Sequence, residues 1–401
     1  MSVPRAHETL RIERAATGGG LAHLSDGRVV FVRHALIGEL VEADVLEITS
    51  SFARADATRV IESSPERVDP PCPYAGPGRC GGCDLQHATP AAQQRWKADL
   101  VAEQLRRIAH VDWHVEVRDA GPVKGYRTRL RCGVNERGYL GLRASRSHEM
   151  VPIGSCYIAD ERFSEAFTHE WTGATEVELR AIGNSEPFAV LSRGAETRVE
   201  IRTLGARPLS TPAPSRVAVG ANTFQVSAQS FWQAHRAAPE LLTREVLRMA
   251  QAEERDSVVD LFSGVGLFSV PLAQRVGRRG RVTAVEASPH AVRDARLNVE
   301  GLDAVRVRQR SVSARSMPGS VARGDIVVLD PPRGGLARGA AAALAACGPR
   351  RIVYVSCDAA TFARDLRELS GGGYVLSDLV AYDFFPMTEH VELVGLLDTG
   401  P

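Results

Sequence analysis

The chain has 401 residues, of which 44% are hydrophobic and 24% charged, and its formal net charge is +1. This length suits two or three domains of an ordinary globular protein, and the charge alone indicates no class of partner. The chain contains no run of about 20 apolar residues and no apolar segment of a signal peptide at its amino terminus, so we expect a cytoplasmic protein without a membrane span. Seven cysteines in such a compartment favour metal binding or catalysis over disulfides.

The first 65 residues have a β-rich pattern. Strand-like runs over 28–36, 39–48 and 57–62 are separated by glycine, aspartate and serine. Short strands that close within about 60 residues predict a small five-stranded barrel, a common nucleic-acid-binding module. A β-domain that only packs on its neighbour fits the same pattern.

Three cysteines follow on a loop rich in glycine and proline: Cys72, Cys80 and Cys83. Glycines allow a backbone to wrap closely around one centre, so the loop predicts a metal site that needs a fourth ligand. Cys156 is the candidate, and Cys132, which lies inside an alternating strand-like run, is the second choice. Four thiolates suit either an iron–sulfur cluster or structural zinc.

A helix is expected over residues 89–109, with Thr89 as its cap and apolar residues at helical spacing. Eight basic residues then fall between positions 118 and 146, with Tyr126 and Tyr139 among them. Such a stretch suits a phosphate backbone with stacking aromatic side chains, although a solvated strand face has the same pattern. Residues 160–215 predict further strands and carry no recognisable chemistry.

The carboxy-terminal half is organised around residues 258–271. A β-branched run leads to Asp260, then to a turn with Gly264 and Gly266, then to an apolar helical pattern, which together predict a strand, a ligand-binding turn and a helix. An acid before the glycines suits a ligand with a cationic amino group. Glu286 ends the next apolar run, where a carboxylate can accept both hydroxyls of a ribose. These residues predict a site for S-adenosylmethionine.

Two further buried strands end in polar residues at positions 330 and 357. In an open parallel sheet, ligands bind beyond the carboxyl ends of the strands, so Asp330 and Cys357 are expected to meet the cofactor. Asp330 precedes two prolines, which fix its carboxylate, and Cys357 precedes a predicted helix start, where amides favour a thiolate. Glu392 lies within an apolar strand pattern, which makes it a candidate general base.

These residues converge on a family. The chain resembles the RNA uracil-C5 methyltransferases, most closely the branch with a TRAM domain and an iron–sulfur cluster (the RumA type), which acts on large-subunit ribosomal RNA. The resemblance covers nearly all of the chain. It rests on an ordered set of motifs: Cys-Gly-Gly-Cys at 80–83, Ser-Phe-Trp-Gln at 230–233, Asp-Leu-Phe-Ser-Gly-Val-Gly at 260–266, Leu-Asp-Pro-Pro-Arg at 329–333, Val-Ser-Cys at 355–357 and His-Val-Glu at 390–392.

The resemblance implies an α/β fold in three parts. Residues 1–65 would form a TRAM-like OB barrel, residues 66–215 a β-rich iron–sulfur and RNA-binding domain, and residues 216–401 a class I (Rossmann-like) methyltransferase domain, on which helix 89–109 would pack. The protein would be a monomer.

The resemblance also implies roles for single residues. Cys357 would be the nucleophile and Glu392 the base, and Gln233, Phe262, Glu286 and Asp330 would contact S-adenosylmethionine. Cys72, Cys80, Cys83 and Cys156 would hold a structural [4Fe–4S] cluster. Addition of a thiolate to uracil C6 would make C5 nucleophilic toward the sulfonium methyl group.

Two departures from the family pattern stand out. Seven residues separate Cys72 from Cys80 where the family more often has five, and Ala359 stands where the family usually has proline. Transfer RNA is the second candidate substrate. The motifs also leave open methylation of an exocyclic amine, which needs no thiol, and a non-catalytic RNA-binding or iron–sulfur protein on the same fold. Cytosine-C5 methylation is disfavoured, because it normally uses a further cysteine after the proline, and here Arg333 follows Pro332.

Overall fold

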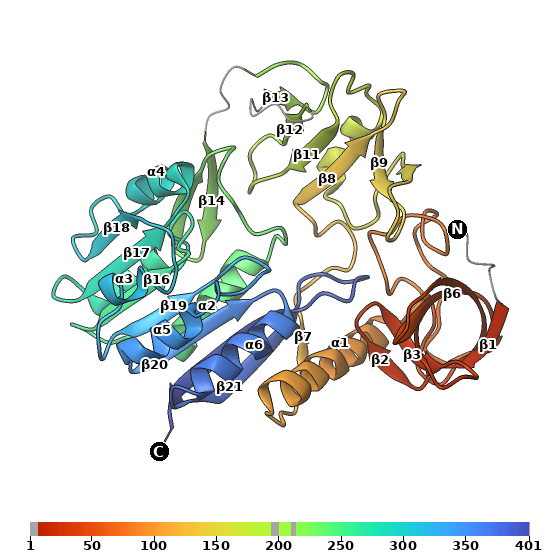
Figure 1. Cartoon of the computed structure of the whole chain (residues 1–401). Helices are drawn as coiled ribbons and strands as arrows, with labels where there is room; N and C mark the ends of the chain where they lie inside the picture. The colour runs from red at the N-terminus through yellow and green to blue at the C-terminus, as the bar shows by residue number, and fades with distance from the viewer. Residues whose placement is uncertain (1–6, 194–199, 210–213, 401) are drawn as a thin grey trace.

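The computed structural model describes residues 7–193, 200–209 and 214–400. Its strands form three large sheets and one hairpin. The three sheets lie in separate regions of the molecule, with the amino-terminal sheet and the middle sheet on one side of the carboxy-terminal sheet (Figure 1).

The amino-terminal sheet curls into a small barrel (Figure 1). Its strands have the order β1-β5-β6-β4-β3-β2, so the barrel has six strands rather than the five expected. Alternate residues of β4, β5 and β6 point into a core of small aliphatic side chains such as Val30, Val41 and Ala53. The strands are β1 (His7–Arg11), β2 (Arg14–Ala16), β3 (Gly19–His23), β4 (Val29–Arg33), β5 (Leu40–Ile48) and β6 (Phe52–Glu62).

The helix that follows the cysteine loop packs on the carboxy-terminal sheet. Helix α1 (Pro90–Gln104) begins at Thr89, whose hydroxyl accepts a hydrogen bond from the Ala92 amide at 3.3 Å, and it continues as a short π-helix, η1 (Leu105–Ala109). Its apolar face shares a core with helix α6 (Ala359–Ser370). Strand β7 (Val117–Asp119) then pairs in parallel with β21 of the carboxy-terminal sheet. Residues 90–119 are thus packed against that sheet.

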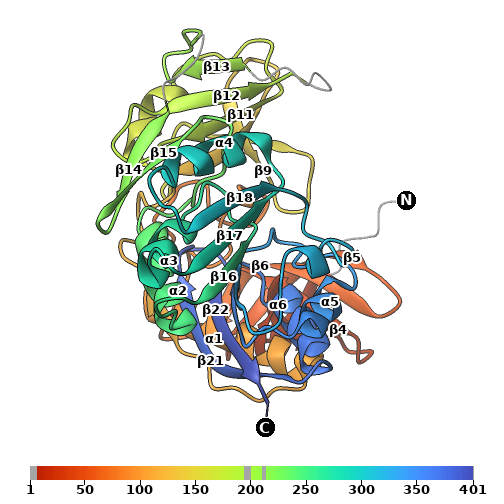
Figure 2. The same ribbon diagram turned by 90° about the vertical axis from the view of Figure 1, so that its left-hand side faces the viewer.

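The middle sheet is antiparallel and has the order β10-β9-β8-β11-β12-β13. Its core contains the fully buried Trp171 and Phe163, the latter on the 3-10 helix η2 (Glu161–Phe167). A hairpin, β14 (Ser215–Val219) and β15 (Asn222–Val226), follows and lies beside α4 in both views (Figures 1 and 2). The strands of the sheet are β8 (Arg129–Val134), β9 (Leu140–Arg143), β10 (Met150–Pro152), β11 (Glu176–Arg180), β12 (Phe188–Ser192) and β13 (Glu200–Thr203).

The carboxy-terminal sheet has eight strands in the order β18-β17-β16-β19-β20-β22-β21-β7. Strands β16 to β20 are parallel, and β22 inserts antiparallel between β20 and β21. The chain order reverses between β16 and β19, which is the switch point where open sheets of this kind bind ligands. The strands are β16 (Ser257–Leu261), β17 (Arg281–Glu286), β18 (Val305–Gln309), β19 (Ile326–Leu329), β20 (Arg351–Ser356), β21 (Tyr374–Asp383) and β22 (Glu392–Thr399).

Helices cover both faces of this sheet. One apolar core contains residues of α2 and α3, and a second contains residues of α1, α5 and α6. The central strands β16, β19 and β20 consist mainly of valine, isoleucine and leucine, as expected for parallel strands buried on both faces. The helices are α2 (Ala238–Ala250), α3 (Ser269–Val276), α4 (Pro289–Asn298) and α5 (Ala340–Cys347). None of the described helices combines the length and apolarity needed to cross a membrane.

Candidate active site

The glycine turn follows β16 at the switch point. Phe262, Gly264 and Gly266 all have positive φ angles, of 61°, 54° and 92°. A non-glycine residue with positive φ is uncommon and costs free energy, which concentrates such residues at functional sites. The strained backbone of this turn therefore indicates a functional constraint in addition to the connection of a strand with a helix.

Glu286 at the end of β17 is fixed against this turn. Its Oε2 accepts a hydrogen bond from the Gly264 amide at 3.0 Å, and its Oε1 accepts one from the Ser288 amide at 2.7 Å. Each carboxylate oxygen has two lone pairs, so both keep acceptor capacity for ligand hydroxyls. Glu286 is therefore fixed at the end of β17 and keeps acceptor capacity.

Asp260 lies in β16, just before the glycine turn, and is fully buried. Its Oδ2 accepts a hydrogen bond from the Ser269 hydroxyl at 2.5 Å, whereas Oδ1 has no partner. Burial raises its pKa to about 7; the Ser269 hydrogen bond opposes this rise, and the charges of Asp330 and Glu286 add to it. Ser269, the residue in the position of the third glycine of a dinucleotide fingerprint, thus has a role that the sequence did not indicate.

Asp330 and Gln233 meet at the next strand end. Asp330 follows β19, and its Oδ2 accepts a hydrogen bond from Gln233 Nε2 at 3.3 Å. Burial raises the pKa of Asp330 to about 7, while the Gln233 hydrogen bond lowers it. The charge of Asp330 also affects Asp260 and Glu392, so the structure gathers these carboxyl groups at one edge of the sheet.

Cys357 directly follows β20, and Glu392 begins the neighbouring strand β22. The last pair of the antiparallel ladder between β20 and β22 is Ser356 with Leu393; Cys357 directly follows the first of these residues, and Glu392 directly precedes the second. Burial, followed by the Glu392 charge, raises the pKa of the Cys357 thiol to about 12, and Arg333 opposes this rise. Burial and then Asp330 hold the pKa of Glu392 well above its usual range.

The start of α6 holds Cys357 in place. Asp358 caps the helix, with its Oδ1 accepting a hydrogen bond from the Thr361 amide at 2.8 Å. The Thr361 hydroxyl donates to the Arg333 carbonyl at 3.2 Å, which ties the segment after β19 to that after β20. Ala359 is the first helical residue, a position that tolerates proline but does not require it.

A loop of residues 384–391, the base loop, leads into Glu392 and is held by the amino-terminal part of the chain. The Met387 carbonyl accepts hydrogen bonds from the Asp84 and Leu85 amides, both at 2.9 Å, and the Met387 amide donates to Gln93 Oε1 at 2.7 Å. Gly18 of the barrel donates its amide to Glu389 Oε2 at 2.8 Å.

The flank of the base loop is held by buried polar contacts. Lys97, fully buried on α1, pairs with Asp383 and donates to the Phe385 carbonyl at 3.0 Å. The Tyr126 hydroxyl donates to the Pro386 carbonyl at 2.9 Å. Segments far apart in the sequence therefore fix the approach to Glu392.

The four predicted metal-binding cysteines line one pocket of about 270 Å³, together with Arg333 and His390. Cys132, the second choice, lies buried in β8 and does not line this pocket. Within the described ranges, no three His, Cys, Asp or Glu side chains converge closely enough to form a site for a metal ion. The four residues are Cys72, Cys80, Cys83 and Cys156.

The basic stretch is only partly free to bind an anion. Arg129, Arg131 and Arg180 surround the carboxylate of Glu178, at 2.8, 3.2 and 2.5 Å. Burial raises the pKa of Glu178, but the Arg129 hydrogen bond and the charges of Arg180 and Arg129 outweigh it and lower the pKa to about 2. The sequence did not reveal this neutralisation.

The expected stacking role of Tyr126 is wrong. Tyr126 is fully buried, because its ring packs beside His235 and its hydroxyl is bound to the base loop. Phe231, which the sequence did not single out for stacking, is 53% exposed, and the Arg129 guanidinium lies 5.6 Å from its ring centre. An exposed aromatic ring beside an arginine is a suitable platform for an RNA base.

The strand order, the glycine turn after β16 and the acid at the end of β17 define a class I S-adenosylmethionine-dependent methyltransferase with two further β-rich regions. The chain is 39% identical to an RNA methyltransferase of Streptomyces avermitilis, over 97% of both chains. It is 33% identical to the 23S rRNA (uracil(1939)-C(5))-methyltransferase RlmD of Pseudomonas entomophila, over 98% of this chain and 94% of the relative.

Residues 215–399 match the family model of tRNA (uracil-5-)-methyltransferases. The fold agrees with that of Pyrococcus abyssi tRNA (uracil-54, C5)-methyltransferase, with a TM-score of 0.71 over 97% of this chain and all of that chain, at 24% identity. The chain belongs to the RNA uracil-C5 methyltransferases. It uses S-adenosylmethionine, and its substrate is RNA.

Proposed function

We propose that the protein forms 5-methyluridine at one uridine of 23S ribosomal RNA, with Cys357 as nucleophile and Glu392 as base. The observation that supports this proposal is that Cys357 and Glu392 adjoin the last pair of the ladder between β20 and β22, and that the charge of Asp330 affects both of them. A thiol just after one strand and a carboxyl group at the start of its neighbour suit attack at C6 and proton removal at the neighbouring C5 of one uracil ring.

The residues of the chain divide the reaction between them. Cys357 first releases its thiol proton to solvent. The thiolate then adds to C6, and the electron pair displaced toward C5 takes the methyl group from the sulfonium, leaving S-adenosylhomocysteine. Glu392 then removes the C5 proton, and the restored C5–C6 double bond expels Cys357 as thiolate. Arg333 is the cationic side chain that favours the thiolate form of Cys357.

We propose that Asp260, Glu286, Asp330 and Gln233 bind the cofactor with the turn of Phe262, Gly264 and Gly266. Asp260 Oδ1, buried and without a partner, is an acceptor suited to an ammonium group. Glu286 is held where it can accept ribose hydroxyls. The hydrogen bond between Gln233 and Asp330 supports a shared role for these two residues in binding the cofactor.

The test is methyl transfer by anaerobically purified protein to unmodified total RNA, followed by separation of ribosomal and transfer RNA and nucleoside mass spectrometry. We expect 5-methyluridine in the ribosomal fraction, and none with Cys357→Ala. Because the matched family model is that of tRNA methyltransferases, transfer RNA is the second candidate. 5-Methyluridine found only in the transfer RNA fraction would replace the first candidate with it, and a fully active Cys357→Ala protein would contradict the mechanism.

We also propose that Cys72, Cys80, Cys83 and Cys156 hold a [4Fe–4S] cluster, and that the barrel is a TRAM-like RNA-binding module. The four cysteines line one pocket, which supports a common centre, and a four-iron cluster keeps its thiolates farther apart than a single zinc ion does. The cluster would be structural, because uracil methylation transfers no electron.

Iron and sulfide analysis of the anaerobic protein tests the cluster, with about four of each expected per chain. Cys156→Ser should lower the iron content, and Cys132→Ser is the matched control, because this buried cysteine lies outside the pocket. Zinc in place of iron, or equal losses in both variants, would contradict the proposal.

A further inference from the structure

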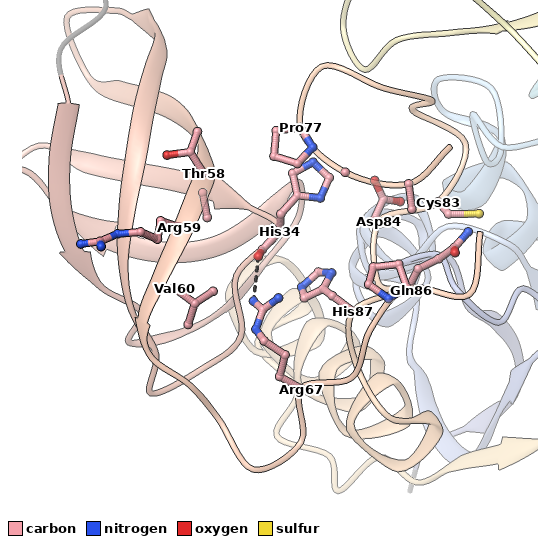
Figure 3. A pocket seen from close by; sticks show the side chains of 14 residues that line it. His34, Thr58, Arg59, Val60, Arg67, Pro77, Cys83, Asp84, Gln86 and His87 are labelled. Atoms are coloured by element: carbon pink, nitrogen blue, oxygen red, sulfur yellow. Dashed lines mark hydrogen bonds between the residues drawn. The ribbon is translucent and has the colours of Figure 1, made fainter. Parts of the chain in front are cut away.

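A second cavity of about 190 Å³ lies between the barrel and the cysteine loop (Figure 3). We call it the barrel pocket. His34, which follows β4 of the barrel, and His87, which lies between the cysteine loop and α1, both face this pocket, with ring centres 6.1 Å apart. Its apolar walls come from small side chains and prolines: Ala57, Val60, Pro70, Ala75 and Pro77.

Both histidines present an unsatisfied nitrogen in buried surroundings. The Nε2 atoms of His34 and His87 are buried and have no hydrogen-bond partner, and His87 is only 4% exposed. His34 also has a positive φ angle of 62°, a strained conformation for a residue with a side chain. A buried polar atom without a partner costs free energy, which a ligand in the barrel pocket would recover.

The hydrogen bonding of His87 defines which ligand group it accepts. Burial, and then the charge of Arg67, lowers the pKa of His87 to about 4, so the ring is neutral at physiological pH. A hydrogen bond with the Ala35 backbone raises the pKa of His87. A hydrogen bond that raises the pKa of histidine is one that the ring donates, because it stabilises the protonated form. Because Nε2 has no partner, this assigns the proton to Nδ1 and leaves Nε2 as an acceptor. The ligand must therefore supply a donor.

The charges around the barrel pocket argue against a phosphate ligand. Arg67 makes two hydrogen bonds of 2.6 Å to the carboxylate of Glu39 and one of 2.8 Å to the His34 carbonyl. Arg59 is paired with Glu42. Both cations lining the pocket are thus already neutralised, and the remaining surface suits a neutral ring with donor groups.

The barrel pocket adjoins the pocket of the four cysteines. The two share a wall made of Ala75, Cys83, Asp84 and Gln86. The sulfur of Cys83 points away from the barrel pocket (Figure 3). On its other side the cysteine pocket reaches Arg333 and His390, which neighbour the catalytic pair. The two pockets thus follow one another from the barrel toward Arg333 and His390.

We propose that the barrel pocket binds one unstacked nucleobase of the RNA substrate and selects a base with an exocyclic amino group, which donates to His87 Nε2. This inference rests on the proposed function in one respect: it takes a flexible segment of the RNA substrate as the ligand. Single-stranded RNA is generally recognised in this way, by bases turned out into pockets and bound at their edges.

The test uses fluorescent RNA nonamers of adenosine and of purine riboside, which differ only in the exocyclic amine, with full-length anaerobic protein. We expect the adenosine nonamer to bind about tenfold more tightly, the worth of one buried hydrogen bond. His87→Phe should abolish this difference. Because His87→Phe also removes the hydrogen bond to Ala35, a second variant is needed.

Val60→Phe fills the barrel pocket and leaves His87 intact, and Ile61→Phe is its control, because Ile61 is 44% exposed and does not line the pocket. Val60→Phe should abolish the preference for adenosine, and Ile61→Phe should keep it. Equal binding of the two nonamers by the wild type, or a preference that survives Val60→Phe, would overturn the proposal. Uridine methylation measured on the same preparations separates the failure of the pocket from that of the proposed reaction.

Discussion

Cys357 and Glu392 adjoin the same end of the antiparallel ladder between β20 and β22, whose last pair is Ser356 with Leu393. The thiol follows a parallel strand, and the carboxyl group begins the one strand that runs against it. The insertion of β22 beside β20 therefore brings together two groups that are 35 positions apart in the sequence. Burial, more than any neighbouring charge, raises the pKa of both groups, so both are neutral until a substrate or a cation changes their surroundings.

Glu392→Gln should stop the reaction after methyl transfer. The amide keeps the shape of the side chain but cannot accept the C5 proton, so Cys357 stays bonded to C6 of the methylated uridine. We expect kcat to fall about 10²–10⁴-fold and a protein–RNA adduct to persist in denaturing gels. Cys357→Ala is the control and should give no adduct. Normal turnover by Glu392→Gln would assign the base to another residue.

Asp260→Asn should increase stability and weaken cofactor binding. Burial raises the folded-state pKa of Asp260 to about 7 from its ordinary 3.8, so the folded protein holds a proton that the unfolded chain releases. The wild type therefore loses stability as pH rises from about 4 to about 7, and the loss is complete above that range.

Asp260→Asn avoids this loss of stability, which is on the order of 4 kcal/mol at pH 8. Thermal unfolding without cofactor, followed across this range, measures the difference, which should be absent at about pH 3.5. Calorimetry with S-adenosylmethionine should give weaker binding by the variant. A variant that is less stable than the wild type at pH 8 would contradict the account.

The fold of the carboxy-terminal half could be predicted from the sequence, because its candidate functional residues lie at the ends of strands. Asp260, Glu286, Asp330 and Cys357 each end a buried apolar run, and a parallel sheet brings such ends to one edge. The class I fold predicted for this half is confirmed by the strand order.

Contacts between segments that are distant in the sequence could not be predicted in the same way. Tyr126 was assigned to RNA stacking, but its burial under the base loop depends on residues 260 positions away. The pairing of Glu178 with three arginines likewise depends on strand register, which local composition does not encode.

Gln93→Leu should slow proton removal without disturbing cofactor binding. Gln93 accepts a hydrogen bond from the Met387 amide and donates to the Ala88 carbonyl at 2.9 Å, so it joins the start of α1 to the base loop. Its loss leaves a buried amide unpaired and costs about 1–3 kcal/mol, part of which we expect to appear as mobility before Glu392.

We expect kcat to fall about tenfold, with KM for RNA unchanged and the covalent adduct more abundant. Gln94→Leu, a change at the next residue of the same helix, is the matched control. A change in KM alone, or equal effects of the two variants, would mean that Gln93 does not position the base.

Phe231→Ala should weaken RNA binding and leave the cofactor site unchanged. The ring is 53% exposed and lies beside Arg129, on the segment that also carries Gln233. Stacking of a base on an aromatic side chain contributes about 1–3 kcal/mol, so the dissociation constant for RNA should rise roughly 5–150-fold.

Val375→Ala is the control for general loss of apolar surface, because Val375 is 47% exposed on β21. Fluorescence titration with RNA, together with calorimetry of S-adenosylmethionine binding, measures both affinities on the same protein. If Phe231→Ala weakened only cofactor binding, the ring would serve to order Gln233 rather than to stack on RNA.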